Sequence, residues 1–196
     1  MSKLATVVLA AGAASRFGQC KLLLAQDGKT LLQRRVDAVR SAGLAEPVII
    51  TGAWHARVHE NHADLDLRFN PDWAQGIGGS IAFAITQLPE SAEAVLFLLA
   101  DQVAVTAEDL RTLVKQWEQH GGVVSALYQG EPGVPAIFPR RLFGELLQLH
   151  GDRGAKKLLN NDGGDAIYVP MAGAAIDIDT TEDWNNWLAN GEQAWS

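Results

Sequence analysis

The run Thr6-Val7-Val8-Leu9-Ala10-Ala11, followed directly by Gly12, is the stretch of this sequence that most restricts its fold. A short, nearly continuous apolar run suits a strand that is buried on both faces, as strands are in a parallel sheet covered by helices. Apolar runs of strand length recur at 47–51, 94–100 and 122–128. The repetition predicts a central sheet whose strands are mostly parallel.

Amphipathic segments of helix length separate these runs, and polar caps mark their ends. Thr30 can cap a helix that stops at Gly43, and Thr106 with Asp109 forms a capping box. The expected helices are 31–42, 81–88, 107–120, 140–149, 153–159 and a last one that starts at Thr180 or Thr181 and runs through Leu188. Alternating strands and helices predict an α/β protein: a three-layer α/β/α sandwich with a Rossmann-like sheet, formed by residues 1–196 as a single domain.

Two further segments indicate where strands begin or end. The run 130–135 contains two glycines and two prolines and reads as a turn between short strands that leave the parallel core. The segment Asp177-Ile178-Asp179 alternates polar and apolar residues and reads as the end of the last strand.

Composition excludes several classes of protein. The 16 basic and 23 acidic residues give a net charge of −7, which argues against non-specific binding to nucleic acid and against docking on an anionic membrane. The one cysteine, Cys20, excludes an intrachain disulfide framework. No apolar run is long enough to cross a membrane, and the N-terminus does not resemble a signal peptide. We expect a cytoplasmic protein.

The loop after the first strand is a candidate phosphate site. It runs from Gly12 to Lys21 and consists mostly of small residues, so its backbone N–H groups can approach an anion closely. Arg16 and Lys21 add two cations suited to phosphate oxygens. The spacing fits neither the Walker loop nor the Gly-x-Gly-x-x-Gly fingerprint. The alternative is a glycine-rich turn with solvated charges.

Carboxylates at strand ends are candidate metal ligands. Asp101 ends the most apolar run, 94–100, and can hold Mg²⁺ together with phosphate oxygens. The second ligand would be Asp177 or Asp179, since two carboxylates are costly to bury without a cation. In the alternative interpretation Asp101 caps a turn, and Asp179 or Thr180 caps the last helix.

Other residues offer weaker candidates. The glycine-rich run 70–80 opens a helix, and its N–H groups with the Ser80 hydroxyl suit the edge of a base. His55 and His59 stand four apart and, with His62, invite a metal interpretation, although such histidines are more often surface residues. Cys20 stands beside Lys21 as a potential reactive thiol, or as a small side chain tolerated in the loop.

Several short motifs follow one another along the chain. They are Leu9-Ala10-Ala11-Gly12 with Arg16, Gly18, Lys21, Leu23 and Leu24; the run 70–76 with Ser80; Leu99-Ala100-Asp101-Gln102; Gly133-Val134-Pro135; the run 151–155; and the run 177–183. Together they resemble the nucleotidyltransferases of the molybdenum cofactor, within the sugar-phosphate nucleotidyltransferase superfamily. Three of them, the loop that begins at Asn70, the run 151–155 and the run that begins at Asp177, are most similar to the cytidylyltransferase branch that acts on molybdopterin.

The resemblance implies a role for each matched residue. Backbone from Ala10 to Gly12, with Arg16 and Lys21, would hold the triphosphate, and Gly76 and Ser80 would contact the base. Asp101 and Asp179 would bind the metal. The candidate catalytic and ligand-binding residues are therefore Ala10, Ala11, Gly12, Ser15, Arg16, Lys21, Gly76, Ser80 and Asp101, with Asp101 and Asp179 for Mg²⁺. The sequence departs from the family at Val103, where Pro is usual, and at Lys156, where Arg is common, and both departures bear on the acceptor.

The implied reaction is Mg²⁺-dependent transfer of CMP from CTP to the phosphate of a molybdopterin-type cofactor, with release of pyrophosphate. A molybdoenzyme would receive the product. Three alternatives stay open: guanylyl transfer to the same cofactor, nucleotidyl transfer to another phosphorylated small molecule, and a delivery module that binds the cofactor without turnover. A module of that last kind has no need of two metal carboxylates.

Overall fold

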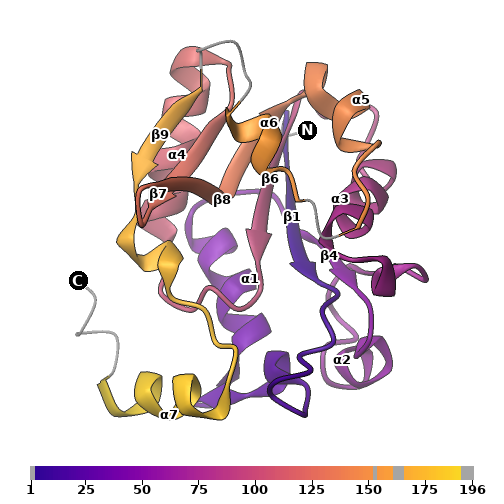
Figure 1. Ribbon diagram of the computed structural model, residues 1–196, viewed down its shortest axis with the longest axis vertical. Coiled ribbons are helices and arrows are strands. Elements are labelled where there is room, and N and C mark those ends of the chain that lie inside the picture. The colour runs from indigo at the N-terminus through magenta and orange to yellow at the C-terminus, as the bar shows by residue number, and fades with distance from the viewer. Residues whose placement is uncertain (1–2, 152–153, 161–165, 191–196) are drawn as a thin grey trace.

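The computed structural model describes residues 3–151, 154–160 and 166–190, which form an α/β fold around one seven-stranded sheet (Figure 1). The strands lie in the order β5-β4-β1-β6-β8-β7-β9. Their bounds are β1 Leu4–Ala10, β4 Val48–Thr51, β5 Leu67–Phe69, β6 Ala94–Leu99, β7 Val124–Tyr128, β8 Glu131–Pro139 and β9 Ile167–Pro170. Neighbours pair in parallel, except that β8 runs antiparallel to β6 and β7. The predicted mostly parallel sheet is confirmed.

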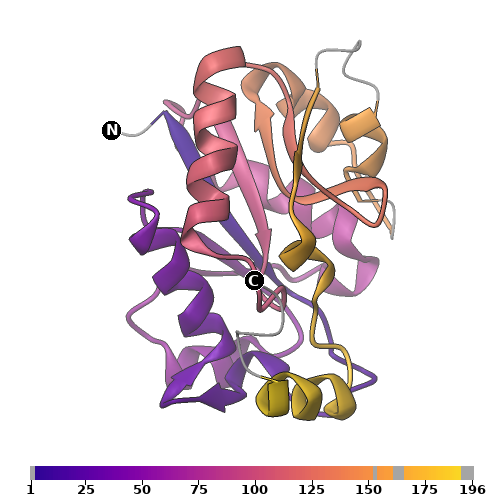
Figure 2. The same ribbon diagram turned by 90° about the vertical axis from the view of Figure 1, so that its left-hand side faces the viewer.

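Helices cover both faces of the sheet (Figure 2). Their bounds are α1 Leu31–Ser41, α2 His55–Asn61, α3 Ile77–Thr86, α4 Ala107–His120, α5 Phe143–Leu146, α6 Lys156–Asn160 and α7 Thr181–Asn190. Short 3-10 helices and a small two-stranded sheet complete the described chain: η1 Lys21–Leu23, β2 Ala25–Gln26, β3 Lys29–Thr30, η2 Trp73–Gln75, η3 Arg140–Leu142 and η4 Ala172–Ala175. Among these residues, no helix combines the length and the apolar character that a membrane span requires.

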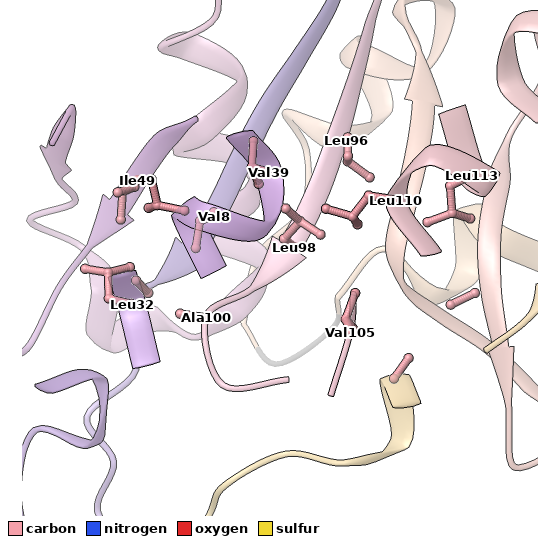
Figure 3. Packing of buried hydrophobic residues seen from close by; sticks show 14 of the residues in the cluster. Val8, Leu32, Val39, Ile49, Leu96, Leu98, Ala100, Val105, Leu110 and Leu113 are labelled. Atoms are coloured by element: carbon pink, nitrogen blue, oxygen red, sulfur yellow. The ribbon is translucent and has the colours of Figure 1, made fainter. Parts of the chain in front are cut away.

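Alternate residues of the central strands pack against different helix layers. Val8 belongs to a buried cluster with side chains of α1 and α4, such as Leu32 and Leu110 (Figure 3). Its neighbour Val7 belongs to a second cluster that includes Ile81 of α3. This two-residue period places a buried face on each side of β1, which explains its continuous apolar sequence. The predicted three-layer sandwich is confirmed.

The predicted caps of α1 and α4 are present. Thr30 Oγ1 accepts the backbone N–H of Gln33 at 3.1 Å. Thr106 Oγ1 accepts the N–H of Asp109, while the Asp109 carboxylate accepts the N–H of Thr106. Gly121, at φ +72°, ends α4 in the left-handed conformation that glycine tolerates best.

Several predicted boundaries were wrong. Helix α3 begins at Ile77, not at residue 81, because Gly76 at φ +96° separates it from η2. The helix expected at 140–149 is η3 followed by the four-residue α5, with helix-weakening Gly144 inside it. In place of the helix expected at 153–159, the structure has α6 at Lys156–Asn160, and the expected cap at residue 152 lies outside the described residues.

Two strand assignments also change. The turn expected at 130–135 lies at Gln129 and Gly130, both with positive φ, and the following prolines belong to β8. The antiparallel excursion itself is confirmed. The segment Asp177-Ile178-Asp179 does not close a strand, because β9 ends at Pro170 and η4 then carries the chain away from the sheet.

Candidate active site

A cavity of about 490 Å³ opens at the carboxyl ends of β1 and β6, where α/β sheets usually bind ligands. In Figure 1 the arrowheads of both strands point toward the end of the molecule that carries α7. The wall of this first cavity includes the ten residues to which the family resemblance gave a ligand or metal role: Ala10, Ala11, Gly12, Ser15, Arg16, Lys21, Gly76, Ser80, Asp101 and Asp179. Asp177, the alternative metal ligand, and the three histidines considered for a metal are not among the lining residues. The fold thus gathers residues from both ends of the chain around one space.

Packing and hydrogen bonds fix the shape of the loop after β1. Its one large apolar side chain, Phe17, is buried in a cluster with Ile178 and Trp184. The carbonyl of Ala14 accepts the N–H groups of Phe17 and Gly18 at 2.9 and 3.1 Å, which curls the loop. These contacts leave the start of the loop facing the cavity.

The side of this loop that faces the cavity is open. A Cβ added at Gly12 would meet no atom within 4 Å, so a ligand can approach its backbone. The Arg16 side chain is 77% exposed and is available to a ligand at the cavity rim. This geometry suits the predicted anion site.

Lys21 stands between two carboxylates. Its Nζ donates to Asp101 Oδ2 at 2.6 Å and to Asp179 Oδ1 at 2.9 Å, while Arg16 Nη1 lies 3.4 Å from Asp179 Oδ2. Burial favours a lower pKa for Lys21, but the two carboxylates outweigh it and raise the pKa of the ammonium. The cation that the two aspartates need is thus supplied, in this structure, by Lys21.

Asp179 reaches this cluster from a loop. The backbone N–H of Ile178 donates to the carbonyl of Asp101 at 3.3 Å, which ties the segment before α7 to the end of β6. Thr180 caps α7, because its Oγ1 accepts the N–H of Asp183 and the Asp183 carboxylate accepts the N–H of Thr180. The cap therefore belongs to Thr180, and the Asp179 carboxylate is directed to Lys21.

Asp177, the other candidate for the second metal ligand, is not one of the two carboxylates that pair with Lys21. Burial raises its pKa, and the nearby charges of Asp179 and Asp101 raise it further. Asp179 shares the Lys21 ammonium with Asp101, so the geometry favours Asp179 as the partner of Asp101.

The donor set fits a divalent cation that also binds a ligand. Oxygens of Asp101 and Asp179 converge on one position, that of the Lys21 Nζ. Within the described residues, no cluster of three or more His, Cys, Asp or Glu side chains is arranged for a metal ion. Two carboxylates without further protein ligands suit Mg²⁺, which keeps waters and phosphate oxygens in its coordination shell.

Two tryptophans on the cavity wall were missed by the sequence reasoning. Trp54 lies just before α2 and donates from Nε1 to the carbonyl of Ala13 at 2.8 Å, which fixes the loop after β1. Trp73, in η2, packs so closely on Gly52 that a Cβ there would lie 2.5 Å from the Trp73 Cβ. The signal for Trp73 was its place inside the glycine-rich run 70–80.

Gln102 and Arg35 support the loop after Asp101, and neither was nominated as a site residue. Gln102 Nε2 donates to the carbonyls of Val134 and Ala174, each at 2.8 Å. The buried guanidinium of Arg35 donates to the carbonyls of Gln102 and Val105. Burial lowers the pKa of Arg35 to about 10, so the group is still charged at neutral pH. Together they connect β6 with α1, β8 and η4.

A second cavity, of about 350 Å³, adjoins the first, since Leu9 and Ile77 line both. Its wall is largely apolar, with Tyr128 and the exposed pair Lys156–Glu131 among its polar members. Burial raises the pKa of Tyr128, as does the charge of Asp177. Gly133 leaves room for the Tyr128 ring, because a Cβ there would lie 2.3 Å from the hydroxyl oxygen.

The histidines and the cysteine have other partners. His55 Nδ1 lies 2.7 Å from Thr51 Oγ1, and His62 Nε2 lies 2.9 Å from Thr30 Oγ1. Thr51 donates its own proton to the carbonyl of Arg68, so His55 Nδ1 is the donor in the first pair. Cys20 is buried, and burial raises the pKa of its thiol, which disfavours the reactive thiolate.

Comparisons with known proteins find relatives that align with nearly the whole chain. The molybdenum cofactor cytidylyltransferase of Escherichia coli (strain K12) is 25% identical over 189 residues, which cover 94% of this chain and 95% of that protein. The purine catabolism protein PucB of Bacillus subtilis (strain 168) is 28% identical over 192 residues, covering 91% and 93% of the two chains.

Solved structures show the same fold. Rv0371c of Mycobacterium tuberculosis H37Rv superimposes with a TM-score of 0.84 at 28% identity, covering 95% of this chain and 97% of that one. Another structure of Rv0371c is a complex with manganese; its TM-score is 0.80 at 26% identity, with 97% and 100% of the chains covered. The MobA-like NTP transferase domain matches residues 6–166. The match spans most of the chain, which therefore belongs to the family of MobA-like NTP transferases and is a nucleotidyltransferase.

Proposed function

We propose that this nucleotidyltransferase uses Mg²⁺ to transfer CMP from CTP to the phosphate of a molybdopterin-type cofactor. The observation that carries the proposal is the cluster of Lys21, Asp101 and Asp179 beside the open loop after β1. Such a cluster suits a triphosphate and its metal ion. The choice of CTP and of the acceptor is supported by the E. coli relative, which aligns over nearly the full length of both chains.

The chemistry requires alignment and charge more than acid–base catalysis. An anionic phosphate oxygen of the acceptor attacks the α-phosphorus of CTP, a new P–O bond forms, and the bond to the bridging oxygen breaks so that pyrophosphate leaves. The attacking oxygen carries no proton, so no general base is needed. Backbone N–H groups from Ala10 to Gly12, with Arg16 and Lys21, hold the phosphates and stabilise the charge on the leaving group.

Asp101 and Asp179 would hold the divalent ion, which when bound neutralises charge on the phosphate oxygens. Lys21 occupies that position in the structure. We therefore assign Lys21 two positions: between the aspartates in the unliganded protein, and on the phosphates in the complex.

We place the acceptor in the second cavity, because it meets the first at Leu9 and Ile77 and is lined by β8 and α6. Its apolar wall suits a ring system, and Lys156 at its edge suits an anionic group. The Bacillus relative is named for purine catabolism, and this favours a second candidate: nucleotidyl transfer to another phosphorylated small molecule. The proposal also includes a molybdoenzyme that receives the product. It places the protein in the cytoplasm, a location that suits the single buried cysteine.

The test is a comparison of nucleotides followed by an assay of turnover. With Mg²⁺ present, we expect CTP to raise the melting temperature more than GTP or UTP does. Pyrophosphate release should then require CTP and molybdopterin together, and Asp101→Asn should abolish it. Equal shifts for all nucleotides would remove the cytidylyl assignment, and a GTP preference would indicate guanylyl transfer. Binding without pyrophosphate release, with every acceptor supplied, would indicate the delivery module.

A further inference from the structure

Asn70 directly follows β5 and is almost completely buried, with 1% of its surface exposed. The backbone N–H of Asp72 donates to Asn70 Oδ1 at 3.0 Å. Because a backbone N–H can only donate, this contact fixes which end of the amide is the oxygen. The amide nitrogen therefore faces the other way, where it donates to Ser80 Oγ at 3.2 Å.

This hydrogen bond determines what Ser80 offers a ligand. A serine hydroxyl has one proton and two lone pairs, and Asn70 uses a lone pair. In residues 3–151, 154–160 and 166–190, no group accepts the Ser80 proton. Ser80 is 3% exposed and lines the first cavity, so its proton is available to a group that enters there.

The charged side chains of the cavity wall lie elsewhere. They are Arg16, Lys21, Asp101 and Asp179, which come from the loop after β1, the end of β6 and the segment before α7. Ser80 lies on α3, beside Gly76 and Ile77 of the wall. A nucleoside triphosphate with its phosphates at the charged cluster would place its uncharged base toward Ser80.

We propose that Asn70 is a positioning residue for base recognition: it keeps Ser80 as a hydrogen-bond donor to an acceptor atom of the nucleobase, a ring nitrogen or a carbonyl oxygen. In cytosine these acceptors are N3 and O2. The inference rests on the proposed function, because it takes a nucleoside triphosphate as the ligand. Asn70 itself touches no ligand and acts through Ser80.

The substitution Asn70→Asp tests the direction of this bond with little change of volume. A carboxylate accepts from both Asp72 N–H and Ser80 Oγ–H, so Ser80 would turn its proton away from the cavity. The new charge also weakens binding of any polyphosphate. Inorganic tripolyphosphate, which has no base, measures that charge effect separately.

We would measure dissociation constants calorimetrically at pH 8 with Mg²⁺ for two ligands. One is tripolyphosphate, and the other is whichever of the nucleotides CTP and GTP binds more tightly to the wild type. The proteins are wild type, Asn70→Asp, Ser80→Ala, Ser80→Thr and Asn61→Asp. Asn61, at the end of α2, is exposed and outside the cavity wall, so Asn61→Asp is the matched control for charge. We expect Asn70→Asp and Ser80→Ala to weaken the nucleotide about tenfold relative to tripolyphosphate, the cost of about one hydrogen bond. Ser80→Thr, which keeps the hydroxyl, and Asn61→Asp should retain the wild-type ratio.

Equal weakening of nucleotide and tripolyphosphate by Asn70→Asp would overturn the inference and leave the proposed function intact. A wild type that binds the nucleotide no more tightly than tripolyphosphate would do the same, since the base is then not read. A wild type that binds neither compound would overturn the proposed function as well. If Asn70→Asp fails to fold, the donor role of Ser80 is decided by the loss of nucleotide affinity in Ser80→Ala and its recovery in Ser80→Thr. Asn70→Ser then replaces Asn70→Asp as the test of positioning.

Discussion

Lys21 Nζ lies 2.6 Å from Asp101 Oδ2 and so joins the loop after β1 to the end of β6. The same ammonium lies 2.9 Å from Asp179 Oδ1. Two carboxylates at one place require a cation, and here that cation is a side chain of the protein. The Lys21 ammonium therefore competes for one position with a divalent ion that both aspartates would bind.

Competition predicts that removing the lysine improves binding of the metal alone. Lys21→Met should bind Mn²⁺ about tenfold more tightly than wild type in the absence of nucleotide, because the carboxylates are no longer neutralised. The free Mn²⁺ signal in electron paramagnetic resonance measures this directly. Arg16→Gln is the control, since it also removes one positive charge beside Asp179 but not from between the two aspartates.

The same Lys21→Met protein should lose turnover by about 10²-fold or more, because the phosphates then lack one stabilising charge. Tighter metal binding with slower turnover is a combination that simple misfolding does not produce. If Lys21→Met and Arg16→Gln change the Mn²⁺ affinity equally, the effect is one of net charge, and the idea of a shared position is wrong.

His62 gives a prediction for stability against pH. It is 7% exposed, and burial lowers its pKa, although Asp64 opposes the shift. Since the folded pKa is below the unfolded value of about 6.5, the unfolded chain takes up the proton first as the pH falls. Stability is therefore fully present above about pH 6.5 and declines below it. Melting temperatures from pH 8 to pH 5 should fall more steeply for wild type than for His62→Gln.

His59→Gln serves as the control for His62→Gln, because His59 is an exposed residue of α2, the helix that His62 directly follows. Its melting curve should follow that of wild type across the range. Parallel curves for wild type and His62→Gln would show that another group governs the acid limb.

The parts of the site that the sequence predicted are those fixed by local pattern. The apolar run 94–100 must be a buried strand, and a polar residue directly after such a strand must stand at its carboxyl end, which located Asp101. The small residues after β1 predicted an open loop in the same way. In both cases the strand alone determines where the next residue lies.

What the sequence could not predict depends on contacts between distant segments. Asp177-Ile178-Asp179 alternates like a strand, but Ile178 is buried against Phe17 and the tryptophans of α7, and this packing directs Asp179 to Lys21. Arg35 was overlooked because an arginine on an amphipathic helix usually faces water. Its spacing from Leu32 and Val39 places it on the apolar face of α1, and that was the available signal.

Arg35 should contribute both to stability and to turnover. Arg35→Met leaves the carbonyls of Gln102 and Val105 without their charged donor in a buried place, so urea unfolding should show a loss of about 2–3 kcal/mol. The loop after Asp101 loosens, and turnover should fall in the fraction that remains folded. Arg40→Met, in the exposed pair with Glu46, should leave both quantities close to wild type. A stability loss with unchanged turnover would limit Arg35 to a structural role.

The two aspartates should separate stability from catalysis. Asp101→Asn takes the 2.6 Å partner from Lys21, whose side chain is only 13% exposed, so the unliganded protein should lose about 1–2 kcal/mol. Asp179 is 43% exposed, and Asp179→Asn should cost less. Turnover should fall strongly in both, and the double variant should be little worse than either single one, because both carboxylates would hold one shared ion. Steady-state kinetics with urea unfolding of all three proteins measures both effects. Losses that multiply independently, or a fully active Asp179→Asn, would mean that Asp179 only restrains Lys21, and the metal would then depend on Asp101 with Asp177.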